Sequence, residues 1–196
     1  MVTVPVQEAR QRPGYEPDRG AVLVVIGGLP GSGKTTLLNR LFGREAPGVL
    51  ALDSEQVSAR LREAGVRIPY RFLRPGVHGW HRRRVLRAIG GAVPVVVLTD
   101  PWTSARWRAA LLRTARRAGR SVCLVLIDAP PEVAADGQAA RGRRITARAM
   151  RRHTARWGGL LRSLAHGEGT DGVDQAVVVD RHRAGRLTRA ELLGRA

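Results

Sequence analysis

The sequence has 196 residues, of which 43 % are hydrophobic, so it is long enough for one domain with a full-sized core. No stretch approaches the ~18 uncharged apolar residues that a bilayer-spanning helix needs, which argues against a membrane protein. The single cysteine, Cys123, excludes a disulfide framework and is expected to be a small core residue.

The formal net charge is +18 at pH 7, and all but one of the 34 Lys and Arg residues are arginine. The arginines are scattered over nearly every predicted helix, which favours charge on solvated faces over a single binding patch. A strongly basic chain also attracts polyanions, which here means nucleotides first and nucleic acid second. Aromatic residues make up only 4 %, too few for a base-stacking platform, so nucleic acid is not the favoured partner.

The first 19 residues contain three prolines and charges of both signs but no apolar core of a signal peptide. We therefore expect residues 1–19 to form a disordered or poorly ordered leader, residues 20–196 to form the folded domain, and the protein to be cytoplasmic.

Apolar runs and helical patterns alternate along the rest of the chain. The runs are continuously apolar, which is typical of parallel strands that are buried on both faces of a sheet. This alternation predicts an α/β fold, a three-layer α/β/α sandwich around a five-stranded parallel sheet. Pro69 and Pro75 predict an irregular segment over 67–79. The expected strands are 21–26, 49–52, 93–99, 121–128 and 175–179, and the expected helices are 33–42, 54–64, 80–89, 104–118, 132–140, 146–164 and 187–195.

The segment Gly28–Thr35 matches the phosphate-binding pattern G-x-x-x-x-G-K-[ST], the P-loop or Walker A motif. It follows a predicted strand and opens a predicted helix, which is the context that this motif requires. Glycines let the backbone turn so that its N–H groups point at phosphate oxygens, and the helix N-terminus adds a positive dipole end. The expected ATP-binding residues are Gly28, Leu29, Pro30, Gly31, Ser32, Gly33, Lys34, Thr35 and Thr36.

The only lysine of the chain, Lys34, stands at the P-loop position. A compact ammonium can bridge the β- and γ-phosphates where a planar guanidinium would not fit, so this exception supports the motif. Lys34 is expected to act in catalysis, and the hydroxyl of Thr35 to coordinate Mg²⁺.

The string GLPGSGKTT, the small size and the alternating layout resemble the P-loop kinases that are grouped with AAA-type ATPases. This group includes small-molecule kinases, polynucleotide-kinase-like enzymes and zeta-toxin-like phosphotransferases, and the resemblance covers about residues 21–195. It implies ATP and Mg²⁺ as cofactors. It also implies the strand order 2-3-1-4-5, with the first strand at the centre of the sheet.

In the related kinases a carboxylate follows the second strand, near Mg²⁺ and the acceptor hydroxyl. Asp53 and Glu55 stand at this place, and the resemblance implies that one of them orients or deprotonates the acceptor. The alternative is a helix N-cap by Asp53 or Ser54. Ser58 stands where many relatives have arginine.

The third strand closes on Asp100, which the resemblance makes a second candidate ligand of Mg²⁺; the alternative is a turn residue before Pro101. The segment Gln138–Thr146 resembles the lid of such kinases. Its Arg141 and Arg144, and then Arg143, are candidates to neutralise charge on the transferred phosphoryl group, with solvated surface charge as the alternative.

Together these features predict transfer of the γ-phosphate of ATP·Mg²⁺ to a hydroxyl group of a small-molecule acceptor. The acceptor pocket is expected within residues 55–82, with Arg71, Arg74 and Trp80 among its lining. Two alternatives remain: an ATP-hydrolysing switch without a phosphorylated product, and a polynucleotide-end kinase.

Overall fold

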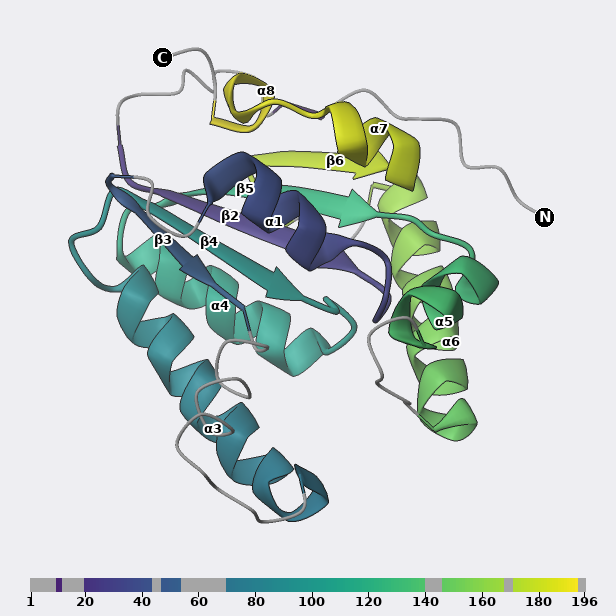
Figure 1. Cartoon of the computed structure of the whole chain (residues 1–196). Helices are drawn as coiled ribbons and strands as arrows, with labels where there is room; N and C mark the ends of the chain where they lie inside the picture. The colour runs from purple at the N-terminus through teal and green to yellow at the C-terminus, as the bar shows by residue number, and fades with distance from the viewer. Residues whose placement is uncertain are drawn as a thin grey trace.

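A six-stranded sheet forms the centre of the computed structural model, which describes residues 10–11, 20–43, 47–53, 70–139, 146–167 and 171–193 (Figure 1). The sheet order is β1-β6-β5-β2-β4-β3. Five strands pair in parallel, with β2 at their centre, which confirms the predicted sheet and its order. The strands are β1 (Arg10–Gln11), β2 (Val22–Gly28), β3 (Val49–Leu52), β4 (Val95–Asp100), β5 (Ser121–Ile127) and β6 (Gln175–Val179).

The sixth strand, β1, comes from the segment expected to be poorly ordered. Arg10 pairs with Ala176 and Gln11 with Gln175, antiparallel to β6. Without this pair, the backbone N–H and C=O groups on that side of β6 would lie at an open edge of the sheet. These two residues therefore belong to the sheet, and the rest of 1–19 lies outside the described residues.

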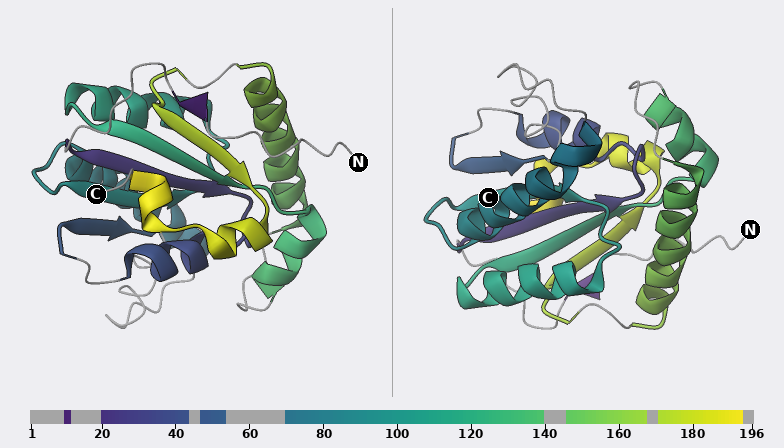
Figure 2. Two further views of the ribbon diagram at one scale, coloured as in Figure 1. Left: turned by 90° about the horizontal axis from the view of Figure 1, so that it is seen from above. Right: turned by 90° about the horizontal axis from the view of Figure 1, so that it is seen from below.

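Helices cover both faces of the sheet and complete the three layers. One face carries α1 (Lys34–Phe42), α7 (Arg181–Arg186) and α8 (Arg189–Leu193), as the view from above in Figure 2 shows. The opposite face carries α3 (Tyr70–Ile89), α4 (Ala105–Arg117) and α6 (Ala147–Ala165), and α5 (Pro131–Ala139) follows β5. Among the described residues, no helix combines the length and apolar character needed to cross a membrane.

Alternate residues of β2 enter two separate cores. Leu23 and Val25 belong to the cluster that packs against α3, α4 and α6, whereas Val24 and Ile26 belong to the cluster against α1, α7 and α8. All four side chains are fully buried, which explains why the strand is continuously apolar and not alternating.

Two helices differ from the prediction. Helix α3 starts at Tyr70 and runs through Pro75, where an irregular segment was expected. A proline inside a helix removes one backbone hydrogen bond, and this cost is offset here by the buried Val85 and Ile89 near the end of the helix. Helix α7 was not predicted, because its six residues bury only Ala184 and carry no apolar periodicity. The helix expected over 54–64 lies outside the described residues.

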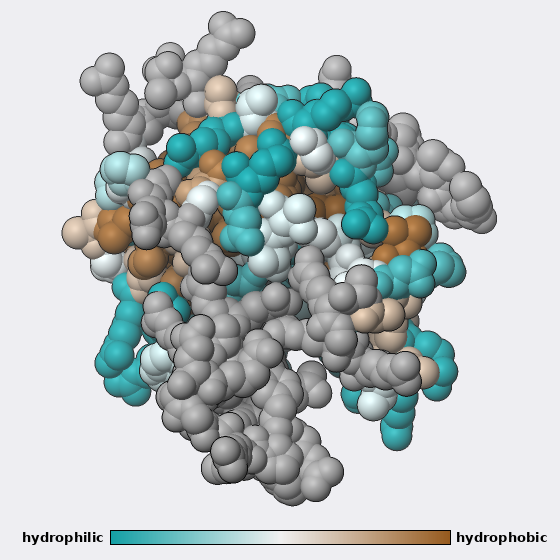
Figure 3. Space-filling view, viewed as in Figure 1, coloured by the Kyte–Doolittle hydropathy of each residue, from teal (hydrophilic) through white to brown (hydrophobic). Residues whose placement is uncertain are grey.

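The basic residues of the last two helices face solvent, as expected for scattered arginines. Arg181, Arg183 and Arg186 are exposed, and Figure 3 shows hydrophilic residues along the upper side of the molecule, where α7 and α8 lie. Cys123 is buried in β5, as expected, and burial raises the pKa of its thiol to about 12. Its thiolate is therefore a negligible species at neutral pH.

One arginine is an exception to this pattern. Arg120 precedes β5 and is only 4 % exposed. Its guanidinium donates hydrogen bonds to backbone carbonyls where α3 ends and where β2 and β4 begin. It thereby ties together the amino-terminal edge of the sheet. The accepting carbonyls are those of Ile89 (2.5 Å), Gly91 (2.7 Å), Val93 (2.8 Å), Pro94 (3.1 Å) and Val22 (3.4 Å).

Candidate active site

The predicted phosphate-binding loop connects the carboxyl end of β2 to the first turn of α1. Gly28, Gly31 and Gly33 have φ angles of 151°, 88° and 102°, which residues with a side chain rarely adopt. A turn closes inside the loop where the Ser32 amide donates to the Leu29 carbonyl at 3.0 Å. The glycine spacing of the motif therefore has a direct conformational cause.

Lys34 folds back over this loop from the first residue of α1. Its ammonium group donates to the carbonyl oxygens of Gly28 at 3.0 Å and Leu29 at 2.8 Å. The cation therefore lies beside the loop backbone, in the position from which it can contact a phosphate held by the loop amides.

The side chain of Ser32 lies in the same loop. Its hydroxyl is buried and has no hydrogen-bond partner among the described residues. A Cβ on Gly28 would lie only 2.6 Å from this oxygen and 2.8 Å from the carbonyl of Ile127, so only glycine fits there. A buried hydroxyl without a partner is costly unless a ligand satisfies it, and a phosphate oxygen in the loop would do so. The residues present therefore fit a nucleotide polyphosphate.

Asp53 and Thr35 meet across the sheet's carboxyl edge. Asp53 directly follows β3 and is 3 % exposed, and its Oδ2 accepts a hydrogen bond of 2.7 Å from Thr35 Oγ1. A hydroxyl and a carboxylate are oxygen ligands of the kind that Mg²⁺ prefers, and Mg²⁺ commonly takes few protein ligands beside phosphates and water. Within the described ranges, no group of three or more His, Cys, Asp or Glu side chains could hold a metal ion.

Asp100, the other predicted metal ligand, has both carboxylate oxygens engaged. Oδ1 accepts from the Trp102 amide at 2.6 Å, and Oδ2 accepts from the indole N–H of Trp107 at 3.0 Å. Burial raises the pKa of Asp100, although these donors and the charge of Lys34 oppose the rise. The carboxylate thus serves as the turn residue of the alternative interpretation and also lies within the electrostatic reach of Lys34.

Trp102 and Trp107 are functional candidates that the sequence analysis missed. Trp107 holds Asp100, and the guanidinium of Arg82 on α3 lies 5.0 Å from the centre of its ring. Trp102 has a φ of 58°, a strained value for a residue with a side chain. A Cβ on Gly27 would lie 3.2 Å from the Cβ of Trp102, so the β4–α4 connection packs directly on the strand that leads into the P-loop. The Asp-Pro-Trp sequence was the available signal, because Asp often accepts from the amide two residues later.

Helix α5 supports the loop from the other side. A Cβ on Gly137 would lie 2.5 Å from the Gly31 carbonyl oxygen, and one on Gly31 would collide with the backbone carbonyl of Ala134. The two backbones therefore touch with no side chain between them.

We expect Gly137→Ala to weaken ATP binding about tenfold, because the new methyl must push the phosphate loop away from α5. The dissociation constant of a fluorescent ATP analogue measures this effect. The matched control is Gly79→Ala on α3, where a Cβ would meet nothing within 4 Å and the change should only favour the helix. Unchanged affinity in Gly137→Ala would show that the loop adapts freely.

Several predicted residues do not join this site within the described part of the chain. Glu55, Arg141, Arg143 and Arg144 lie outside the described residues, as do the side chains of Arg71 and Arg74. Trp80 is half exposed on α3, and Thr36 is exposed on α1. The structure instead brings Arg181 of α7 next to the loop, with its Nε 3.9 Å from where a Cβ on Gly33 would lie.

Comparisons with known proteins agree with this architecture. The chain resembles a gluconokinase from Sinorhizobium meliloti 1021 with a TM-score of 0.52 and 17 % identity, over 90 % of this chain and 91 % of that one. It resembles a tunicamycin resistance protein of Deinococcus radiodurans with a TM-score of 0.54 and 17 % identity, over 90 % and 97 %. It resembles a shikimate kinase from Acinetobacter baumannii with a TM-score of 0.50 and 19 % identity, over 85 % and 90 %.

These likenesses identify the fold as that of the P-loop kinases. No curated protein sequence matches the chain. The family model described as an AAA domain matches residues 23–166, which is more than half of the chain and includes the P-loop, Asp53 and Asp100. The chain is therefore a P-loop, kinase-like member of the AAA domain family.

Proposed function

We propose that the protein is a phosphotransferase that moves the γ-phosphoryl group of ATP to a hydroxyl group of a small-molecule acceptor. The observation that carries this proposal is the P-loop itself, with Lys34 folded over its carbonyls and Thr35 in contact with Asp53. The gluconokinase and the shikimate kinase named above are small-molecule kinases of the same fold, which makes a small acceptor the natural choice.

Each residue of the site has a role in this proposal. The loop amides and Lys34 bind the phosphates and neutralise negative charge that moves onto the leaving β-phosphate. Thr35 and Asp53 are the residues that would hold Mg²⁺, which supplies further neutralisation of the phosphate oxygens. Asp100, held by two N–H groups, keeps a carboxylate near Lys34 and so favours its charged form.

The transfer step forms a bond between the acceptor oxygen and the γ-phosphorus and breaks the bond from that phosphorus to the β,γ-bridging oxygen. ADP leaves, and the acceptor proton passes to a carboxylate. Asp53 or Glu55 is the proposed base, because Asp53 directly follows β3 and Glu55 stands two residues further along the chain. Arg141 and Arg144 remain the proposed cations of the lid.

A single-turnover reaction with γ-labelled ATP and Mg²⁺ tests this function. The acceptor source is the low-molecular-mass fraction of a cell extract, with a 5′-hydroxyl oligonucleotide in a parallel reaction. Label in a new small molecule supports the proposal. Label only in inorganic phosphate, with the extract present, would instead favour the ATP-hydrolysing switch. Label on the oligonucleotide would favour the polynucleotide-end kinase.

A further inference from the structure

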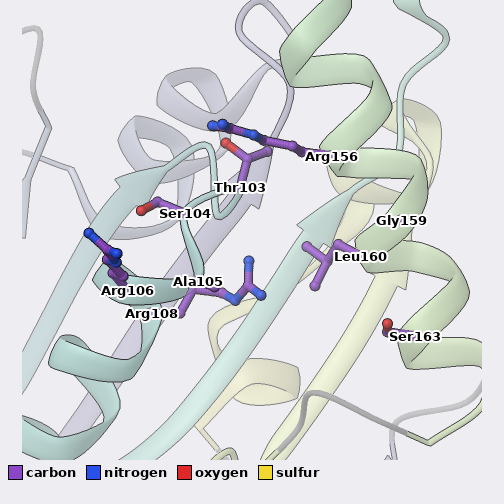
Figure 4. Close-up of a pocket in the computed structure, with 9 residues that line it drawn as sticks. All are labelled: Thr103, Ser104, Ala105, Arg106, Arg108, Arg156, Gly159, Leu160 and Ser163. Atoms are coloured by element: carbon purple, nitrogen blue, oxygen red, sulfur yellow. The ribbon is translucent and has the colours of Figure 1, made fainter.

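A cavity of about 440 Å³ lies between the start of α4 and the middle of α6, on the sheet face opposite α1. Its polar lining comes from the β4–α4 connection, from α4 and from α6, as Figure 4 shows. We call it the arginine cavity, because three of its lining residues are Arg106, Arg108 and Arg156. The volume is in the range of pockets for small molecules.

The lining of the arginine cavity is cationic and contains no carboxylate. The hydroxyl groups of Thr103, Ser104 and Ser163 complete its polar surface. Within the described ranges, none of the three arginines forms an ion pair with an Asp or Glu. Three guanidinium groups with neutral hydroxyls between them match an anion with several oxygens, because each fork can donate two parallel hydrogen bonds.

Arg108 and Arg156 are held in the cavity in different ways. Arg108 donates to the carbonyl of Trp102 at 2.7 Å, which fixes it to the β4–α4 connection. Burial lowers the pKa of Arg108, although the charge of Asp100 opposes this shift, so the cation has lost part of its hydration and gains from a bound anion. Arg156 reaches from α6 toward Thr103, across the space between the two elements (Figure 4). The lining therefore combines one fixed cation with one that reaches across the cavity.

The cavity shares the β4–α4 connection with the candidate active site. Thr103 and Ser104 follow Asp100 by three and four residues. Trp102, which lies between Asp100 and Thr103 in the chain, packs against Gly27 just before the P-loop. Thr103 is tied to α6 by a 3.2 Å hydrogen bond between its Oγ1 and His153 Nδ1. The β4–α4 connection thus forms one wall of the cavity and at the same time holds Asp100, a carboxylate within the electrostatic reach of Lys34.

We propose that the arginine cavity binds an oxyanion group, a carboxylate or a phosphate, that the phosphoryl acceptor carries besides its reacting hydroxyl. This inference rests on the proposed function and makes the substrate class narrower: an anionic small molecule, not a neutral sugar or nucleoside. It also moves the expected acceptor contacts from residues 55–82 to the β4–α4 connection and α6.

A pair of matched double variants tests the proposal. Arg106→Gln/Arg156→Gln removes two cavity cations, one from α4 and one from α6. Arg113→Gln/Arg152→Gln removes two exposed arginines from the same two helices and leaves the cavity lining intact. Arg108 is kept in both, because it also supports the β4–α4 connection.

The measurement is calorimetric titration with inorganic phosphate and, separately, with malonate, while ADP·Mg²⁺ occupies the P-loop. We expect the cavity variant to bind at least one probe on the order of tenfold or more weakly than the wild type, and the control variant to stay within about twofold. Equal weakening in both variants, or no binding of either probe to the wild type, would overturn the proposal.

Two further readouts separate this inference from the proposed function. If the wild type transfers label from ATP to an acceptor that carries no anionic group, the cavity proposal is wrong and the proposed kinase function is supported. If the wild type neither binds nor turns over ATP, the kinase proposal is wrong whatever the titrations show. A 5′-hydroxyl oligonucleotide that loses affinity equally in both double variants would indicate a diffuse basic surface and also contradict the cavity.

Discussion

Replacing Lys34 with alanine is expected to lower the rate of phosphoryl transfer or ATP hydrolysis by about 10²- to 10³-fold, the usual effect of removing one preorganised charge from such a site. The ammonium lies 2.8–3.0 Å from two loop carbonyls and is the cation closest to the bound phosphates in the proposed complex. The single-turnover rate with labelled ATP measures the effect, and nucleotide titration shows how much of it comes from binding.

Lys34→Arg is the informative companion, because it keeps the charge and changes only the shape. The other 33 of the 34 Lys and Arg residues are arginine. If a guanidinium worked equally well at this position, nothing would explain why the chain has a lysine there. We expect this variant to be nearly as slow as Lys34→Ala, because the planar group does not fit against the carbonyls of Gly28 and Leu29. Arg152→Ala, a loss of charge on the exposed side of α6, should retain the wild-type rate. Full activity of both Lys34 variants would exclude the P-loop as the reaction site.

The second large effect concerns stability. Arg120→Ala is expected to lower the free energy of unfolding by more than about 4 kcal/mol. The substitution leaves several backbone carbonyls at the amino-terminal edge of the sheet without their donor and creates a cavity among α3, β2 and β4. Urea unfolding followed by circular dichroism measures the loss.

Arg120→Ala could fail to accumulate as a folded protein, so Arg120→Lys provides a measurable second case. One ammonium group replaces three donating nitrogens, and we therefore expect an intermediate loss of roughly half the alanine effect. Arg117→Ala, an exposed residue at the end of α4, should change the free energy of unfolding by less than about 0.5 kcal/mol. A loss in Arg120→Lys no larger than in Arg117→Ala would mean that the hydrogen bonds to the carbonyls contribute little.

The fold was largely predictable because its main elements are marked by local patterns. The three longest core strands, β2, β4 and β5, contain continuous apolar runs, and the P-loop glycines fix the turn between β2 and α1. The segment 181–186 carries no such pattern, since it is rich in arginine and buries only Ala184. It becomes a helix through Asp180, which caps its first turn by accepting from the Arg183 amide at 2.6 Å. Asp180 could be recognised as a helix cap only if a helix was already expected to start there.

The candidate active site could be predicted as a list of residues but not as a set of contacts. Lys34 and Thr35 were predicted from the motif, and Asp53 from the resemblance to the P-loop kinases. That Thr35 donates to Asp53 depends on α1 crossing the sheet toward β3, which no local pattern reports. The partners of Asp100 were missed because Trp107 reaches it from the first turn of the next helix. The arginine cavity was missed because its cations are indistinguishable in sequence from the solvated arginines around them.

The contact between Gly31 and Gly137 has a mechanical consequence. Two main chains that touch without side chains between them have no compressible layer to absorb displacement, so α5 and the phosphate loop must shift together. A ligand that fills the loop is therefore expected to restrict the motion of α5 as well. Amide hydrogen exchange in α5 should therefore report whether the phosphate loop is occupied. By linkage, a ligand that held α5 in place would raise the affinity for ATP by the same coupling free energy.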